Sequence, residues 1–351
     1  MDHQNIRISF YDAKPYDVEN FNRENRKYGF TITYHEEHLN AKTAVFCKGS
    51  RIVCAFVNDD LSEETLKILY EEGVELVALR CAGYNNVDFR YAFGKIHVVR
   101  VPAYSPYAVA EHAMALLMTL NRHLHRAYSR TRDFNFSLVG LTGMDLHGKT
   151  VGVIGTGKIG RCFIDICRGL GMKVLAYDPY PAEIPDVTYT DLSTLLSSSD
   201  VISLHCPLTE ENYHLINEKT IKEMKDGVLI INTSRGALID SKALLDALIE
   251  RKIGAAGLDV YEEEAEMFYE DKSNEIMNDA VMARLMSLPN VLLTSHQAFL
   301  TREALQNIAE TTLSNILDFI EERPLVNEIC YKCPDSADKD DCRHTQNGRC
   351  F

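Results

Sequence analysis

A glycine-rich turn that follows an apolar run constrains the fold more than any other feature of this sequence. The run Val151–Ile154 leads directly into Gly155-Thr156-Gly157-Lys158-Ile159-Gly160, after which apolar residues recur at helical spacing. In such a motif the first glycine permits a tight turn, the second leaves room for a ligand beside the backbone, and the third lets the helix approach the strand. The sequence therefore predicts a strand–turn–helix unit of a parallel α/β sheet.

Short apolar runs alternate with helical patterns through the rest of the chain, which favours the α/β class throughout. The predicted strands cover Ile6–Phe10, Val53–Val57, Leu76–Leu79, His97–Val99, Thr150–Ile154, Lys173–Tyr177, Val201–Leu204, Val228–Ile231, Ala255–Val260 and Val291–Thr294. A long helix is expected from Ser105 to about Arg130, and a final helix from about Arg302 to Glu322 is expected to return to the first domain. The length of 351 residues exceeds what one hydrophobic core usually supports, so we expect two domains.

The charge balance narrows the possible partners. The formal net charge is −14, and an acidic chain is repelled by nucleic acid and by anionic membrane surfaces. An anionic substrate must therefore be attracted by local cations. The polar start of the chain does not resemble a secretory signal, and no apolar run approaches the roughly 20 residues of a membrane span. We expect a soluble, cytoplasmic protein.

The glycine motif also indicates a nucleotide site. Free N–H groups at the start of the following helix can bind a pyrophosphate. The next predicted strand ends at Asp178, about 20 residues further on, where an acid that binds the adenosine ribose belongs. A carboxylate there accepts hydrogen bonds from both ribose hydroxyls and repels a 2′-phosphate, which favours NAD over NADP. The alternative is a glycine turn followed by an aspartate that caps a loop.

Three polar residues follow late predicted strands, at the sheet edge where open α/β folds place their ligands. Arg235, Glu264 and His296 are these residues. A guanidinium binds a carboxylate through two parallel hydrogen bonds, and a histidine titrates near neutral pH and can give or take a proton. A carboxylate beside the imidazole stabilises its charged form. Each residue alone also fits a structural role, as a surface arginine, a solvated glutamate or a hydrogen-bonded core histidine.

The combination of motifs resembles the D-isomer-specific 2-hydroxyacid dehydrogenases, and most closely the fermentative D-lactate dehydrogenases among them. The similarity extends from about Ile6 to Glu328. Its distinctive stretches are Arg80–Asp88, Val101–Pro106, the glycine motif, Ser203–Leu208, Asn232–Gly236, Gly257–Tyr261 and His296–Phe299. The resemblance implies two Rossmann-like domains: a doubly wound NAD-binding domain over residues 103–297, and a smaller, discontinuous, flavodoxin-like substrate-binding domain over residues 1–102 and 298–330.

The resemblance also implies an NAD-dependent enzyme that interconverts pyruvate and D-lactate by hydride transfer. Arg235 would bind the substrate carboxylate, His296 would be the acid/base, and Glu264 would be its partner, because the family's glutamate lies five positions after the aspartate matched by Asp259. Asp259 would accept a hydrogen bond from the nicotinamide carboxamide. The remaining implied cofactor residues are Gly155, Gly157, Lys158, Ile159, Gly160, Asp178, Cys206, Pro207, Asn212, Thr233 and Ser234. The implied substrate residues, besides Arg235, are Ala82, Gly83, Tyr104 and Phe299.

Two other functions remain open at this point. A larger 2-keto acid would need a roomier pocket around Tyr104 and Phe299, and some relatives of this fold act as NADH-sensing binding modules with an intact catalytic set. The resemblance further implies a homodimer or higher homo-oligomer, for which the helix that starts at Ser105 is a candidate contact.

The last part of the chain, residues 331–351, departs from the family pattern as a cysteine-rich tail. Cys330, Cys333, Cys342 and Cys350, together with His344, lie in a polar segment. They could form a tetrahedral zinc site, but the spacing contains only one Cys-x-x-Cys pair. We expect a flexible tail with reduced thiols and no metal, since polar segments of this kind do not form a core. The other six cysteines lie in apolar segments, where they behave as small buried hydrophobes.

Overall fold

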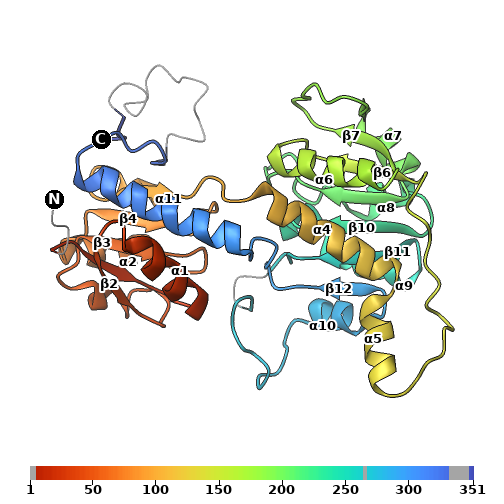
Figure 1. Ribbon diagram of the computed structural model, residues 1–351, viewed down its shortest axis with the longest axis horizontal. Helices are drawn as coiled ribbons and strands as arrows, with labels where there is room; N and C mark the ends of the chain where they lie inside the picture. Colours follow the sequence, from red (N-terminus) through yellow and green to blue (C-terminus); the bar gives the residue numbers. More distant parts are fainter. Residues whose placement is uncertain (1–4, 264–266, 332–347) are drawn as a thin grey trace. The chain divides into compact units, whose positions relative to one another are not determined.

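The computed structural model describes residues 5–263, 267–331 and 348–351. The chain forms two compact units, coloured along the sequence in Figure 1. Unit 1 comprises residues 1–105 and 301–351, and unit 2 comprises residues 106–300. No helix in the described ranges is long and apolar enough to cross a membrane.

Unit 1 is built on a five-stranded parallel sheet with the order β2-β1-β3-β4-β5, which is the flavodoxin-like strand order. Its elements are β1 (Arg7–Phe10), α1 (Pro15–Asn25), β2 (Thr31–Tyr34), η1 (Ala44–Cys47), β3 (Ile52–Ala55), α2 (Glu63–Glu71), β4 (Leu76–Leu79), α3 (Phe89–Ala92), β5 (His97–Arg100) and α11 (Arg302–Ile320). Strands β3 and β4 are buried along their whole length, as expected for a parallel sheet covered on both faces. Helix α11 packs on α1, β4 and β5, so both ends of the chain build this unit.

Unit 2 is built on a seven-stranded parallel sheet with the order β12-β11-β10-β9-β6-β7-β8. Its elements are α4 (Pro106–Asn121), α5 (Leu124–Arg132), β6 (Thr150–Ile154), α6 (Lys158–Gly169), β7 (Lys173–Tyr177), β8 (Thr188–Tyr189), α7 (Leu192–Ser198), β9 (Val201–Leu204), α8 (Glu218–Glu223), β10 (Val228–Asn232), η2 (Gly236–Leu238), α9 (Ser241–Ile249), β11 (Ile253–Leu258), α10 (Ala280–Ser287) and β12 (Val291–Leu293). The order reverses between β6 and β9, and ligands of open α/β sheets bind beyond the strand ends at such a point.

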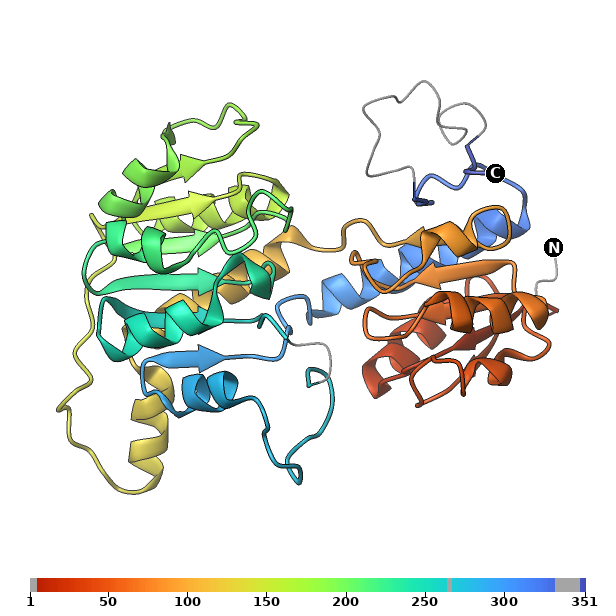
Figure 2. The same cartoon turned by 180° about the vertical axis from the view of Figure 1, so that it is seen from behind.

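Two layers of helices cover the sheet of unit 2. Helices α4 and α6 pack together on one face, where Leu117 and Phe163 are fully buried in one apolar cluster with Val151 of β6. Helices α7 to α10 cover the other face, seen from behind in Figure 2, with Leu195 and Leu244 in a second apolar cluster. Strand residues alternate between the two clusters, which is the arrangement of a doubly wound fold. The predicted α/β class with two Rossmann-like sheets is confirmed.

The ten predicted strands are all present, with ends that differ by at most two residues. The sequence analysis missed β2 and β8, both of which are edge strands. The side chains of β2 are exposed or half-buried, and β8 has only two residues, so neither produces an apolar run.

The single long helix expected from Ser105 to about Arg130 is wrong. Helix α4 ends at Asn121, His123 has a left-handed backbone (φ = +50°), and α5 follows at a new angle without a buried residue. Asn121 stops the helix from continuing along the sheet, because its side chain exchanges two hydrogen bonds with the backbone of Met144 (2.9 and 3.0 Å).

The interpretation of residues 331–351 as a flexible tail is wrong for the part that the structure describes. Residues 348–351 are anchored on unit 1: Leu325 donates to the Gly348 carbonyl at 2.6 Å, and the Phe351 ring stacks on His97 with centroids 4.1 Å apart. Glu328 accepts from the Cys350 amide and also lies 2.5 Å from the His97 ring nitrogen Nδ1. Cys333, Cys342 and His344 lie outside the described residues.

Arg349 provides a test of this anchor. Its guanidinium donates to the carbonyls of Asp318 and Phe319, in the last turn of α11, and to that of Arg323 just after the helix. We predict that Arg349→Ala lowers the free energy of unfolding by about 1–2 kcal/mol. Arg302→Ala, at the opposite end of the same helix, is the matched control and should change it by less than about 0.5 kcal/mol. Urea unfolding followed by circular dichroism measures both, and equal stability of the two variants would contradict the anchor.

Candidate functional site

The glycine turn after β6 has the shape that a nucleotide requires. Gly155 has a left-handed backbone (φ = +94°), and a Cβ there would lie 2.6 Å from the carbonyl carbon of His205. A Cβ on Gly160 would lie 2.1 Å from the Gly155 oxygen, so close packing excludes a side chain at both positions. A Cβ on Gly157 would meet no atom within 4 Å. The turn is therefore closed on its inner side and open at its middle glycine, directly before the N-terminus of α6.

The side chain of Asp178 lies next to this turn. Its Oδ2 accepts from the amide and the hydroxyl of Thr156 at 2.7 and 2.9 Å, and its Oδ1 accepts from the Tyr180 amide at 2.9 Å. Burial alone would raise the pKa of Asp178, but these donors outweigh burial and hold the pKa below its usual range. The carboxylate is thus ionised and fixed beside the glycine turn, where it can accept further hydrogen bonds. Thr156 was missed by the sequence analysis, because nothing in the motif indicates contact with a residue on the next strand.

The other predicted cofactor residues lie in the loops that follow β9 and β10. The hydroxyl of Ser234 donates to the Leu204 carbonyl at 2.8 Å and so ties the loop after β10 to the end of β9. Asn212 donates to the Pro207 carbonyl at 2.7 Å and shapes its own loop, which also contains the half-buried Cys206. Lys158 is exposed and Ile159 half-buried in the first turn of α6.

Thr233 gives a more direct indication of a ligand. Its hydroxyl is buried and has no hydrogen-bond partner among the residues that the structure describes. A buried polar atom without a partner is uncommon in a native structure. Together with the open face of Gly157 and the ionised Asp178, this atom makes the carboxyl edge of unit 2 fit a dinucleotide.

The segments that follow β10, β11 and β12 are joined by a series of backbone hydrogen bonds. The Asp259 amide donates to the Asn232 carbonyl at 2.9 Å, and the His296 amide donates to the Asp259 carbonyl at 2.7 Å. Because these three parallel strands are neighbours, the segments that carry Arg235 and His296 emerge at one edge of the sheet.

Arg235 has a fixed backbone and an unneutralised charge. The Asn232 side chain donates to the Arg235 carbonyl at 2.9 Å, and the guanidinium donates to the Ser234 carbonyl at 2.7 Å. Within residues 5–263, 267–331 and 348–351, no carboxylate forms an ion pair with Arg235. In a chain with a net charge of −14, a half-buried cation without a carboxylate partner is suited to an anionic ligand.

His296 has a strained backbone that its neighbours hold in place. Its φ of +52° lies in the left-handed region, which costs a non-glycine residue about 1–3 kcal/mol and persists only where the surroundings fix it. The Asp259 carboxylate accepts from the amides of Gln297 and Ala298 at 2.9 and 2.8 Å, and the hydroxyl of Tyr269 donates to the His296 carbonyl at 3.2 Å. The loop that presents the imidazole is therefore fixed on both sides of His296.

Asp259 itself is fully buried and has further donors around it. Thr294 donates from its hydroxyl to Oδ1 at 2.5 Å, and His112 Nε2 lies 3.3 Å from the same oxygen. Burial would raise the pKa of Asp259, but the hydrogen bonds from His112, Thr294 and Ala298 hold it below its usual value. Its predicted contact with nicotinamide stays a prediction. The sequence analysis missed His112, although it lies between Val109 and Leu116 on the buried stripe of a helix, an unusual place for a histidine.

Glu264 lies outside the described residues, and its role stays a prediction. Its neighbour Glu262 has a different partner: its Oε1 lies 2.5 Å from Nε2 of His214, and its Oε2 accepts weakly from the Ser241 amide at 3.4 Å. Burial would raise the pKa of Glu262, but these hydrogen bonds lower it.

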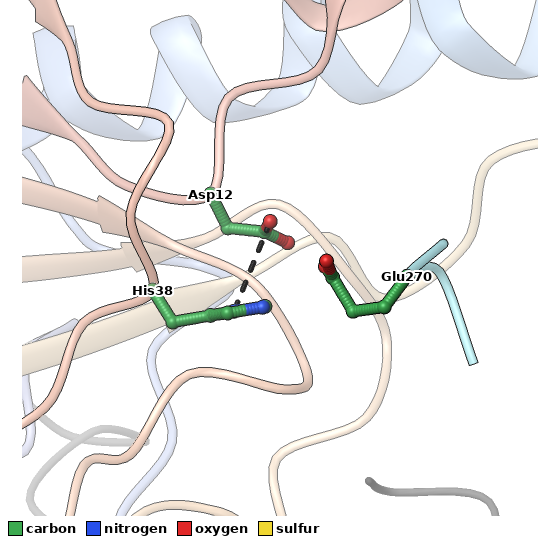
Figure 3. Close-up of side chains that lie close together, drawn as sticks. All are labelled: Asp12, His38 and Glu270. Carbon is green, nitrogen blue, oxygen red and sulfur yellow. Dashed lines mark ion pairs between the residues drawn. The ribbon is translucent and has the colours of Figure 1, made fainter. Parts of the chain in front are cut away.

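In unit 1, the predicted substrate residues Ala82 and Gly83 follow β4 and are anchored by Arg80. This arginine is 2% exposed and donates to the Asp12 carbonyl at 2.7 Å, with the carboxylates of Asp12 and Asp17 each 3.7 Å away. Figure 3 shows the Asp12 side chain directed at the ring of His38, whose Nδ1 lies 3.8 Å from Oδ1.

The Arg80 cluster leaves the following loop with free donors. Arg100 donates to the Ala82 carbonyl at 2.8 Å and Cys81 donates from its thiol to the Gly83 carbonyl at 3.2 Å, but the amides of Ala82 and Gly83 donate to no group that the structure describes. Tyr104 is half-buried in the same unit, and Phe299 is 9% exposed in unit 2.

We predict that Asp259→Asn destabilises the folded chain by about 2 kcal/mol at pH 7, because an amide cannot accept at both positions where the carboxylate does. A carboxyl whose pKa is lowered on folding stabilises the fold above its unfolded pKa, near 3.9, and this contribution is lost as pH falls through the folded value. The difference between wild type and variant should therefore narrow below about pH 4.

Urea unfolding at a series of pH values measures this difference, with Asp246→Asn as a control because Asp246 is about half exposed (54%) on α9. Equal free energies of unfolding of wild type and Asp259→Asn at pH 7, or a difference that stays constant in acid, would contradict the account of Asp259.

Comparison with known proteins agrees with this geometry. Residues 114–298 match the family model described as "D-isomer specific 2-hydroxyacid dehydrogenase, NAD binding domain". The chain is 53% identical over 329 residues to a D-lactate dehydrogenase of Escherichia coli, an alignment that covers 92% of this chain and 100% of the relative.

The solved apo-structure of D-lactate dehydrogenase from Escherichia coli superposes with a TM-score of 0.86 at 52% identity (92% of this chain, 100% of that one). The pyruvate reductase of Chlamydomonas reinhardtii superposes with a TM-score of 0.89 at 44% identity (93% and 99%). The chain belongs to the family of D-isomer-specific 2-hydroxyacid dehydrogenases, and unit 2 contains its NAD-binding domain.

Proposed function

We propose that this chain is an NAD-dependent D-lactate dehydrogenase, which converts pyruvate, NADH and a proton into D-lactate and NAD, and the reverse. The observation that carries the proposal is the unneutralised Arg235, which follows β10 at the same sheet edge as the fixed loop of His296, in the unit that binds NAD. The names of the two similar proteins, a D-lactate dehydrogenase and a pyruvate reductase, support pyruvate as the keto acid.

Each catalytic residue has a distinct role in this proposal. Bound NADH supplies the hydride that reaches the keto carbon. Arg235 holds the substrate carboxylate through two parallel hydrogen bonds and stabilises the charge that develops on the keto oxygen. Protonated His296 gives its proton to that oxygen, and Glu264 stabilises the imidazolium before the transfer. In the reverse direction neutral His296 accepts the hydroxyl proton of D-lactate.

The cofactor and the substrate are assigned to different parts of the chain. Residues 103–297 bind NAD, with the glycine turn, Lys158 and Ile159 at the pyrophosphate and Asp178 at the adenosine ribose. The ionised Asp178 repels a 2′-phosphate and so selects NAD. Cys206, Pro207, Asn212, Thr233 and Ser234 line the ribose positions, and Asp259 faces the carboxamide.

Residues 1–102 and 298–330 bind the substrate. The amides of Ala82 and Gly83 are available to a substrate carboxylate, because they have no acceptor within the described part of the chain. Tyr104 and Phe299 are each assigned to the substrate by the family resemblance, and the bulk of either aromatic ring disfavours a larger 2-keto acid.

NADH oxidation tests this proposal directly. Purified protein is mixed with pyruvate, glyoxylate, 2-ketoisocaproate or phenylpyruvate, and the chirality of the product is determined. We predict the highest kcat/KM for pyruvate, with D-lactate as the product. A preference for one of the two larger acids would instead support a different 2-hydroxyacid dehydrogenase, and tight NADH binding without turnover on any of them would support an NADH-sensing module.

We further propose that the chain acts in the cytoplasm as a homo-oligomer. Reduced cysteines support the first part: Cys47, Cys54 and Cys167 are buried and unbridged. An exposed apolar surface supports the second. Helix α5 and the loop after it, the yellow segment of Figure 1, expose Tyr128, Phe134, Phe136, Leu138 and Val139 by 64–85%. A surface of this kind marks a protein contact. It overlaps the expected contact only at Tyr128, because most of α4, the first part of the helix expected from Ser105 to about Arg130, is buried against its own unit.

We predict that Phe136→Asp dissociates the oligomer, because a charge in the centre of an apolar contact must be desolvated. Tyr180→Asp is the matched control, since Tyr180 is 90% exposed elsewhere on unit 2. Sedimentation velocity should show wild type and Tyr180→Asp as oligomers and Phe136→Asp as a smaller species. A monomeric wild-type protein at micromolar concentration would contradict the proposal.

A further inference from the structure

A polar network connects helix α4 to the loop of His296, and the proposed reaction gives no role to two of its members, His112 and Thr294. Nε2 of His112 lies 3.1 Å from the hydroxyl oxygen of Thr294 and 3.3 Å from Oδ1 of Asp259. Helix α4 packs on β11 and β12, the two strands from which Asp259 and the His296 loop emerge. The imidazole thus reaches the carboxyl edge of the sheet from the helix layer behind it.

The hydrogen-bond donors and acceptors of this network define the role of His112. Thr294 has a single hydroxyl proton and donates it to Asp259 at 2.5 Å, so its oxygen is left as an acceptor. The only side chain of the three that can supply a donor to that oxygen is His112, through a proton on Nε2. Asp259 in turn accepts from the two amides that follow His296. The network therefore runs from His112 through Thr294 and Asp259 to the backbone on the C-terminal side of His296.

From this geometry we infer that His112 is a positioning residue for the reaction: through Thr294 and Asp259 it holds the loop that presents His296. The inference rests on the proposed role of His296 as acid/base. His112 is 19% exposed at its side chain and touches neither Arg235 nor the glycine turn in the hydrogen bonds described for it, so its effect must pass through Asp259. The left-handed backbone of His296 makes this support necessary, because a strained residue relaxes when its surroundings loosen.

Two substitutions separate a positioning role from a merely structural one. His112→Phe removes the Nε2 donor but keeps a planar ring, whereas His112→Gln keeps an N–H donor near the same place. We predict that His112→Phe lowers kcat for pyruvate roughly 10- to 100-fold, the effect of a displacement of about 1 Å at a reacting group. His112→Gln should stay within about three-fold of wild type, and the NADH dissociation constant should change less than about two-fold in both. His147→Phe, the same change at an exposed histidine of unit 2, is the control and should leave kcat unchanged.

A double-mutant cycle then tests the route of the effect. The readout is binding of oxamate, a planar isostere of pyruvate, to the protein–NADH complex, followed by quenching of NADH fluorescence. Because this readout needs no turnover, it remains measurable when His296 is replaced. We predict that His112→Phe weakens oxamate binding in the wild-type background and adds no further loss in the His296→Asn background.

The inference is overturned if His112→Phe keeps the wild-type kcat, or if kcat of His112→Gln falls as far as that of His112→Phe. It is also overturned if His112→Phe loses NADH binding together with kcat. In the double-mutant cycle, independent losses of oxamate affinity from His112→Phe and His296→Asn would overturn it as well. Failure of the proposed function is a separate result: it appears as full turnover of the single variant His296→Asn, whatever His112 does.

Discussion

The Asp259 carboxylate is the interaction on which the functional edge of this protein depends. It lies at the end of β11, between the strand that leads to Arg235 and the strand that leads to His296. Its backbone amide and carbonyl bridge the two neighbouring segments, and its side chain binds the amides after His296. A charged acceptor buried in this place is stable only while it has donors, so the loops around it have little freedom to move apart.

This constraint explains how an acidic protein can offer a site to an anion. The chain carries 51 acidic and 37 basic residues, and many of its lysines and arginines form ion pairs on the surface. Arg235 is different, because its guanidinium donates only to the backbone of its own loop and pairs with no described carboxylate, which leaves its charge for a ligand. The acidic side chains near this edge are hydrogen-bonded to other groups: Asp259 to the His296 loop, Glu262 to His214, and Asp178 to Thr156. The electrostatics around Arg235 therefore depends on which groups the nearby acids bind, and not on the net charge of the chain.

Most of the fold could be predicted from the sequence, because parallel strands buried on both faces appear as apolar runs and the glycine motif identifies the first strand–turn–helix unit of unit 2. The two edge strands could not, since their half-exposed residues alternate weakly. The break at His123 also escaped, because it depends on hydrogen bonds between Asn121 and Met144, which are 23 residues apart. In the site, residue types that perform chemistry are visible in the sequence, whereas the residues that orient them are not. Thr156 resembles an ordinary turn residue, and the unusual position of His112 on a buried helical stripe does not reveal that its partner is Asp259.

The central claim is that His296, held by this edge, exchanges the proton of the reaction. The most direct test compares wild type with His296→Asn, measuring kcat/KM for pyruvate across pH together with the NADH dissociation constant. The account predicts a loss of roughly 10²- to 10⁴-fold in kcat/KM, the usual contribution of a general acid, with NADH binding unchanged. It also predicts a different pH profile for the variant, because the group that donates the proton has been removed. Turnover within a few-fold of wild type, with the same pH profile, would contradict it.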